Sequence, residues 1–238
     1  MRNISLEDLL AAGAHFGHMT RNWDPNMEEY IFSKKNGVHI IDLYKTIEQL
    51  TKAVDLVSSA VNKGGSILFV ATKKSAKAVV EEEADRCGMF HVTERWLGGT
   101  LTNFMTIKKS IKKLHMLEKD ETSGIAETLT KKELLMRSRE RSRLQTQHRG
   151  IKDMRRLPDV VIVVDAHKES IAIAEALRLE IPIIAIVDTN ADPRKVDIPI
   201  PANDDSIQTI RLLMGILADS ILEAKGVSQA KDNEEVSA

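Results

Sequence analysis

The chain has 238 residues, of which 42% are hydrophobic and 4% aromatic, and its formal net charge at pH 7 is −1. This length and composition are typical of one large globular domain, or of a domain with an insertion. The single cysteine, Cys87, excludes a disulfide framework and a zinc site built from several thiolates. No apolar run is long enough to cross a membrane, and the first residues do not resemble a signal peptide, so we expect a cytoplasmic protein.

The first part of the chain predicts alternating helices and apolar strands. A capped helix over 5–10 ends near Gly13, and an irregular segment follows it. Strands are expected over 38–41, 67–71 and 90–93, separated by helices over 45–61 and from 72 to about 86.

A glycine-containing motif, RWLGGTLTNF, follows at 95–104. Adjacent glycines allow a sharp turn, Trp96 supplies an apolar anchor, and Thr102 or Asn103 can cap a helix. Apolar residues at helical spacing then form a seam, and lysines occupy the opposite face. The seam consists of Phe104, Ile107, Ile111 and Leu114, and the lysines are Lys108, Lys109, Lys112 and Lys113.

A second basic helix is predicted from Leu129 to His148. A capping box at 130–133 marks its start, and a loop around Ser123 and Gly124 precedes it. The helix carries arginine at every second position from 137 to 143. Arg137 and Arg141 would share one face, and Arg139 and Arg143 the other. Lys109 and Lys113 face away from the apolar seam, and none of Lys109, Lys113, Arg139 and Arg143 is expected in the core. The two limbs predict a helical hairpin that projects from a globular body.

Continuous apolar strands are expected after the hairpin, over 160–164 and 183–187, with a helix over 169–179 between them. A proline-containing extended segment over 193–201 precedes a last helix that ends near Ala224, and the polar tail is expected to be disordered. The predicted fold class is α/β: a parallel sheet with helices on both sides and a hairpin inserted after the third strand. We assign 1–103 and 150–226 to the body, 104–149 to the hairpin arm and 227–238 to the disordered tail.

Charge is strongly segregated along the chain. Residues 106–156 hold 15 Lys and Arg against 7 Asp and Glu, a net of +8, whereas the remainder holds 19 against 28, a net of −9. A solvated helix face normally mixes the two signs, so this separation favours a polyanionic partner, nucleic acid above all. The alternative is a protein-binding scaffold whose basic arm meets an acidic partner.

An enzyme is a weaker interpretation. Asp165, His167, Asp188 and Asn190 would gather at the carboxyl ends of the strands, where α/β proteins bind ligands. No glycine-rich phosphate loop follows a strand, however, and no nucleophile motif is present. We therefore expect no catalysis and no small-molecule substrate; the remaining enzyme alternative acts on a phosphorylated substrate. Few aromatic residues are available for base stacking, so the arm suits phosphate contacts with double-helical RNA.

Several blocks of sequence, in order along nearly the whole chain, resemble the small-subunit ribosomal protein S2 family of bacterial and organellar type. They are AGAHFGH at 12–18, VHIIDL at 38–43, RWLGGTLTN at 95–103, KKE at 131–133, GIKDM at 150–154, LPD at 157–159 and IVDTN at 186–190. The resemblance implies a flavodoxin-like, three-layer parallel sheet with a coiled-coil hairpin. It also implies binding to small-subunit ribosomal RNA, contacts with neighbouring small-subunit proteins, and help in docking the S1 protein that captures messenger RNA.

The candidate RNA-binding residues are Arg95 and Trp96 in the motif and the basic residues of the arm. The arm residues are Lys108, Lys109, Lys112, Lys113, Lys131, Lys132, Arg137, Arg139, Arg141, Arg143 and Arg149. No cofactor is required, but His18, Asp188 and Asp205 are expected to approach one another at the carboxyl edge of the sheet. They are candidate ligands for one divalent ion, zinc or magnesium.

Overall fold

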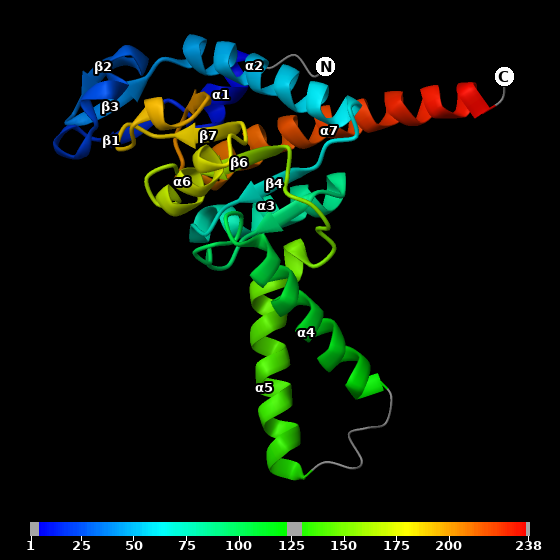
Figure 1. The fold of residues 1–238 in the computed structure, drawn as a ribbon. Helices are drawn as coiled ribbons and strands as arrows, with labels where there is room; N and C mark the ends of the chain where they lie inside the picture. The colour runs from blue at the N-terminus through cyan, green and yellow to red at the C-terminus, as the bar shows by residue number, and fades with distance from the viewer. Residues whose placement is uncertain (1–4, 123–129, 237–238) are drawn as a thin grey trace.

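The computed structural model describes residues 5–122 and 130–236, which form an α/β body with one long projecting arm (Figure 1). At the centre is a parallel sheet of five strands in the order β5-β4-β6-β7-β8. The bounds are β4 Ile67–Val70, β5 Phe90–Val92, β6 Val160–Val164, β7 Ile183–Val187 and β8 Ile198–Pro201. Numbered along the chain within this sheet, the order is 2-1-3-4-5, the flavodoxin-like order. The predicted fold class is confirmed.

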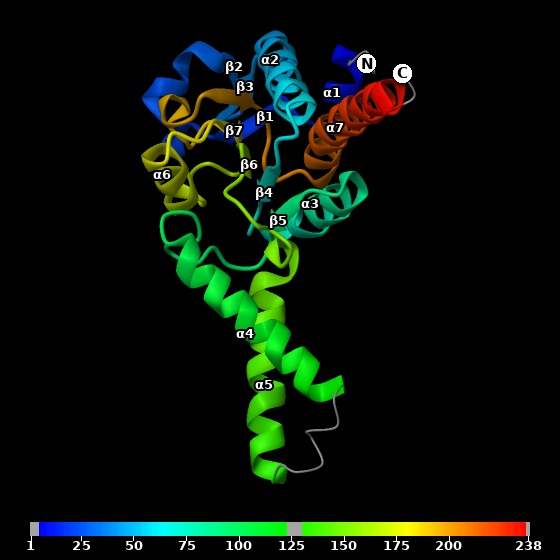
Figure 2. The same cartoon turned by 45° about the vertical axis from the view of Figure 1, so that its right-hand side comes forward.

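Helices cover both faces of this sheet, which explains why its strands are almost entirely apolar, with His91 of β5 as a polar exception (Figure 2). One face packs against α2, α3 and α7 through residues such as Phe69 and Ile162. The other face packs through Leu68 and Val161 against α6 and the segments around the arm root, which include Trp96. The bounds of these helices are α2 Leu43–Asn62, α3 Lys74–Cys87, α6 Ser170–Arg178 and α7 Ile207–Val236. A short α1, Leu6–Ala12, packs against α2 and α7.

A second, antiparallel sheet of three strands was not predicted. Its order is β1-β3-β2, with β1 Phe16–Met19, β2 Ile31–Lys35 and β3 Val38–Ile41. Short 3-10 turns, η1 Thr20–Asn22 and η2 Pro25–Tyr30, lie between β1 and β2. The 38–41 segment is therefore a strand, but not of the parallel sheet, and the arm follows the fifth strand of the chain instead of the third. β1 and β2 escaped prediction because both are short and largely solvent-facing, so neither shows a buried face.

Two predicted boundaries change near the C-terminus. The extended segment contains η5, Pro193–Lys195, and then β8. β8 is an edge strand of the sheet. Proline is tolerated there because an edge strand has a neighbour on one side only, so its missing backbone N–H need not break a hydrogen bond between strands. The last helix does not end near Ala224, because its backbone is helical to Val236. No proline interrupts that stretch. No helix in the described ranges is both long and apolar enough to cross a membrane.

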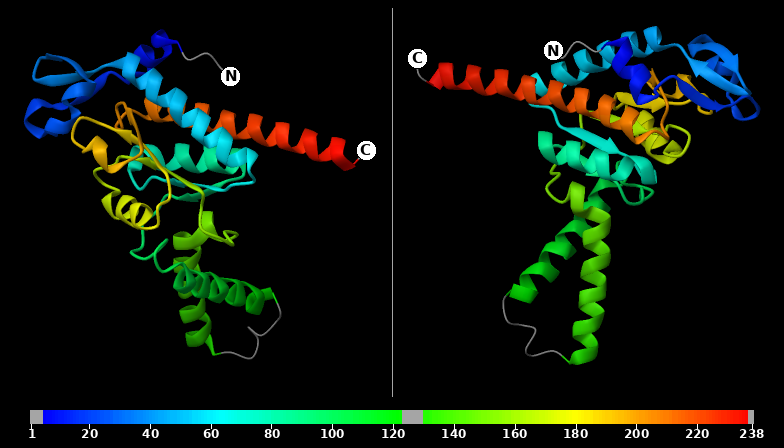
Figure 3. Two further views of the ribbon diagram at one scale, coloured as in Figure 1. Left: turned by 45° about the horizontal axis from the view of Figure 1, so that its top comes forward. Right: turned by 180° about the vertical axis from the view of Figure 1, so that it is seen from behind.

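The arm consists of α4, Phe104–Thr122, and α5, Lys131–His148, followed by the turn η4, Arg149–Ile151. The predicted capping box at the start of α5 is confirmed by reciprocal bonds between Thr130 and Glu133. The predicted loop around Ser123 and Gly124 lies outside the described residues. The limbs pack near the body and diverge outwards (Figures 1 and 3). Their buried residues, which include Ile107 and Leu144, accordingly lie towards the root.

Candidate functional site

A buried carboxylate fixes the loop from which the arm leaves the body. Glu175 of α6 is 8% exposed, and its Oε1 accepts hydrogen bonds from the Trp96 indole (3.1 Å) and the Gly99 backbone N–H (2.7 Å). Its Oε2 accepts from the backbone N–H groups of Leu101 and Thr102 and from the Thr102 hydroxyl, each at 3.0 Å. Burial alone would raise the pKa of Glu175, but these donors hold that pKa below its ordinary value.

The same loop shows why the motif needs a glycine at position 99. Gly99 has φ +88°, a left-handed conformation that L side chains rarely adopt. Trp96 is only 7% exposed, with its indole N–H bonded to Glu175, so its ring packs against the body. Glu175 itself was not predicted, because it sits inside an ordinary helix more than seventy residues further along the chain.

Acidic residues neutralise some of the predicted RNA-binding residues. Across the limbs, Lys113 pairs with Glu140 at 2.5 Å, and Arg137 pairs with Asp120 at 3.1 Å. Arg143 lies 4.0 Å from Glu140, and Arg149 pairs with Glu81 of the body. Lys113 was expected to point away from the hairpin packing, but it joins α4 to α5. These ion pairs link α4 to α5 and η4 to α3.

Other predicted residues remain available for a partner. Within the described ranges, five exposed cations of the arm have neither an ion pair nor a hydrogen-bonded side-chain partner. They are Lys109, Lys112, Lys131, Lys132 and Arg139, and we call them the free arm cations. Arg95 in the motif is also exposed. Lys108 is half-buried with its ammonium 4.8 Å from the centroid of the Phe104 ring, and Arg141 is half-buried on α5.

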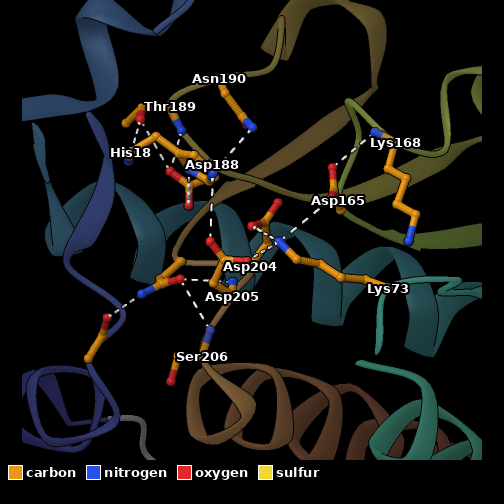
Figure 4. A network of polar contacts seen from close by, with 12 residues as sticks. His18, Lys73, Asp165, Lys168, Asp188, Thr189, Asn190, Asp204, Asp205 and Ser206 are labelled. Atoms are coloured by element: carbon orange, nitrogen blue, oxygen red, sulfur yellow. Dashed lines mark hydrogen bonds and ion pairs between the residues drawn. The ribbon is translucent and has the colours of Figure 1, made fainter. Parts of the chain in front are cut away.

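Polar side chains gather at the carboxyl edge of the parallel sheet (Figure 4). Lys73, at the start of α3, lies 2.6 Å from both Asp204 and Asp205 and 3.6 Å from Asp165. Burial opposes its charge, but hydrogen bonds to Asp204 and Asp205 hold the pKa of Lys73 above its ordinary value. Burial, followed by the neighbouring Asp165 and Asp188, raises the pKa of Asp204 to about 7.

His18 completes this cluster. Its Nδ1 lies 3.0 Å from Asp188 Oδ2 and its Nε2 lies 3.7 Å from Asp205 Oδ2, so both predicted carboxylates lie beside His18. The hydrogen bond to Asp188 raises the pKa of His18. Ligand atoms of His18, Asp188 and Asp204 lie within 4.8 Å of one another, and Asp204 Oδ2 has no hydrogen-bond partner within the described ranges. An imidazole with carboxylates fits zinc, and the carboxylates alone fit magnesium, although Lys73 already neutralises part of the charge.

The sheet order, the projecting hairpin and its free cations define the class of protein: a flavodoxin-like α/β body that carries a basic helical arm. A family model described as ribosomal protein S2 matches residues 9–224. The match covers most of the 238 residues, so the protein belongs to the ribosomal protein S2 family. Membership gives the protein a structural role in the small ribosomal subunit.

Proposed function

We propose that the arm anchors the protein in the small ribosomal subunit by binding ribosomal RNA, in a ribosome of the bacterial-type cytoplasm. The observation that carries the proposal is the set of free arm cations: five exposed positive charges that no acidic side chain within the described ranges neutralises. Because unpaired Lys and Arg contact phosphates at little desolvation cost, they supply most of a sequence-independent affinity for nucleic acid.

Double-helical RNA is the target that this surface fits best. Aromatic residues make up 4% of the chain, and Trp96 is buried, so the surface offers few rings for stacking against unpaired bases. The basic helices of the arm instead suit contacts along the sugar–phosphate backbone. The role is structural, without a substrate or a catalytic step.

Affinity for small-subunit RNA over a salt series tests the proposal. In the arm variant, all five free arm cations are changed to Gln, which preserves helix propensity. In the matched body variant, five exposed cations outside the arm are changed to Gln: Arg21, Lys35, Lys63, Lys74 and Lys195. Each duplex-type phosphate contact contributes about 0.9 to the slope of log affinity against log salt, so the loss of five contacts should flatten that slope by up to about 4.5 units.

The body variant should keep most of the wild-type slope, since it loses the same charge from surfaces outside the arm. Circular dichroism must show that both variants are folded. An arm variant that is folded and retains the wild-type slope would contradict RNA binding. The basic arm would then fit the second candidate function, a scaffold whose arm meets an acidic protein.

We further propose that the body contacts neighbouring small-subunit proteins, among them the S1 protein. Large apolar side chains are exposed around the small antiparallel sheet, which is typical of a protein-binding surface. They include Phe16, Met19, Phe32 (74% exposed) and Tyr44. Recovery of S1 with the tagged protein should fall in a Phe32→Ser variant that still binds RNA, and unchanged recovery would remove Phe32 from the interface.

A divalent ion at the carboxyl edge is a separate proposal. His18, Asp188 and Asp205 would hold zinc or magnesium, with Asp204 as the additional carboxylate that the structure brings to them. The ion would compete with Lys73 for Asp204 and Asp205, so we expect binding to be weaker than the number of ligands alone suggests.

A further inference from the structure

A second group of metal-ligating side chains lies away from the carboxyl-edge cluster, where α3 and β5 meet the root of the arm. Glu81 and Asp85 are one turn apart on α3 and therefore share a helix face. The turn after α3 passes through Gly88 in a left-handed conformation (φ +60°) and brings His91 of β5 back beside them. One ligand atom from each of the three residues lies within 4.8 Å of the other two.

The imidazole of His91 gives the group a buried nitrogen ligand in addition to its two carboxylates. His91 is only 5% exposed, and its Nε2 lies 3.5 Å from Asp85 Oδ1. Its Nδ1 has no hydrogen-bond partner within the described ranges, and Gly150 covers that edge so closely that a Cβ at 150 would lie 2.4 Å from Nδ1. Packing therefore directs Nε2 towards the two carboxylates.

The electrostatic balance at the group also suits a cation. Burial lowers the pKa of His91, although Asp85 and Glu81 oppose the shift. Glu81 pairs with Arg149 of η4, whereas Asp85 is 69% exposed and open to solvent. A cation entering from solvent would meet Asp85 first and would compete with Arg149 for Glu81.

We propose that Glu81, Asp85 and His91 bind a divalent transition-metal ion of the zinc type at the root of the arm. One imidazole and two carboxylates are a ligand set that Zn²⁺ accepts in tetrahedral geometry, with water in the fourth position. Arg149 and Gly150 both contact this group, and they belong to the segment by which the arm returns to the body. A bound ion would therefore lie beside that segment. This site is independent of the RNA-binding proposal.

Calorimetric titration of the full chain with Zn²⁺ tests the site. A His18→Gln background removes the imidazole of the carboxyl-edge cluster, so that the remaining binding reports on Glu81, Asp85 and His91. In that background, Asp85→Asn should weaken Zn²⁺ binding by roughly tenfold or more, because it removes a direct ligand. The matched change Asp55→Asn, an exposed carboxylate of α2, should have no effect. Arg149→Gln should strengthen binding by up to about fivefold, the equivalent of one partly exposed ion pair.

The ring signals of His91 in a nuclear magnetic resonance spectrum provide a readout that needs no variant of the site. They should shift on addition of Zn²⁺ to the wild-type chain. The proposal is overturned if the His18→Gln protein binds no Zn²⁺, if Asp85→Asn leaves its affinity unchanged, or if the His91 signals do not move.

Discussion

Glu175→Gln is the sharpest test of how the arm is attached to the body. The substitution keeps the shape of the side chain but replaces one carboxylate oxygen with an NH₂ group, which cannot accept a hydrogen bond. Oε1 accepts two bonds and Oε2 accepts three, so either orientation of the amide leaves at least two donors unsatisfied. A hydrogen bond to a charged group contributes about 1.5–3 kcal/mol, so the expected loss is about 3–6 kcal/mol. That is a large share of the stability of an ordinary domain.

Urea unfolding followed by circular dichroism measures this loss, and tryptophan emission in a Trp23→Phe background reports on the loop that contains Trp96. Glu28→Gln, at an exposed carboxylate of η2, is the matched control and should change stability by less than about 0.5 kcal/mol. The pKa of Glu175 is lowered in the folded protein, so its stabilisation is present above the ordinary Glu pKa of about 4.3 and is lost as the pH falls through the folded value. The difference between wild type and Glu175→Gln should therefore shrink in acid. A variant as stable as wild type at neutral pH would refute the role of this carboxylate.

Three further predictions follow from single positions. Gly99→Ala should cost about 1–2 kcal/mol in urea unfolding, because the residue has positive φ and the added Cβ would lie 3.1 Å from that of Asn103; an unchanged midpoint would contradict this. Ile162→Asp places an unpaired charge in the central strand and should abolish soluble expression, whereas a soluble variant with normal thermal unfolding would show that the strand is not buried. Dialysed wild-type protein should retain zinc or magnesium that Asp188→Ala loses, and equal, near-zero metal in both proteins would end the proposal of an ion at the carboxyl edge.

Patterns within short stretches of sequence predicted the elements whose own residues show which face is buried. The strands at 160–164 and 183–187 were recognisable because helices cover both of their faces, and the seam of Ile107 and Ile111 predicted α4. The short strands β1 and β2 were missed because they are mostly exposed. β8 was not predicted as a strand of the sheet because it contains two prolines. These strands exist because of their pairing partners, which a sequence window does not contain.

The candidate site was likewise predicted only in part from the sequence. Charge segregation predicted a basic arm, but it could not separate the free cations from those that acidic side chains neutralise. Lys113 was expected to be free and is paired, because Glu140 on the other limb lies beside it only after the hairpin forms. Glu175 and Asp204 were missed for a related reason: Glu175 meets Trp96, and Asp204 meets Lys73, only through tertiary packing across more than seventy residues.

The central claim, that the free arm cations anchor the protein to the small subunit, is tested most directly in cell lysate. Tagged wild-type protein, the arm variant and the body variant are separated by gradient sedimentation, and each fraction is probed for the tag. Wild-type protein and the body variant should migrate with small ribosomal subunits, while much of the folded arm variant should remain at the top of the gradient as a free species. Equal migration of the arm variant with the subunits would contradict the claim.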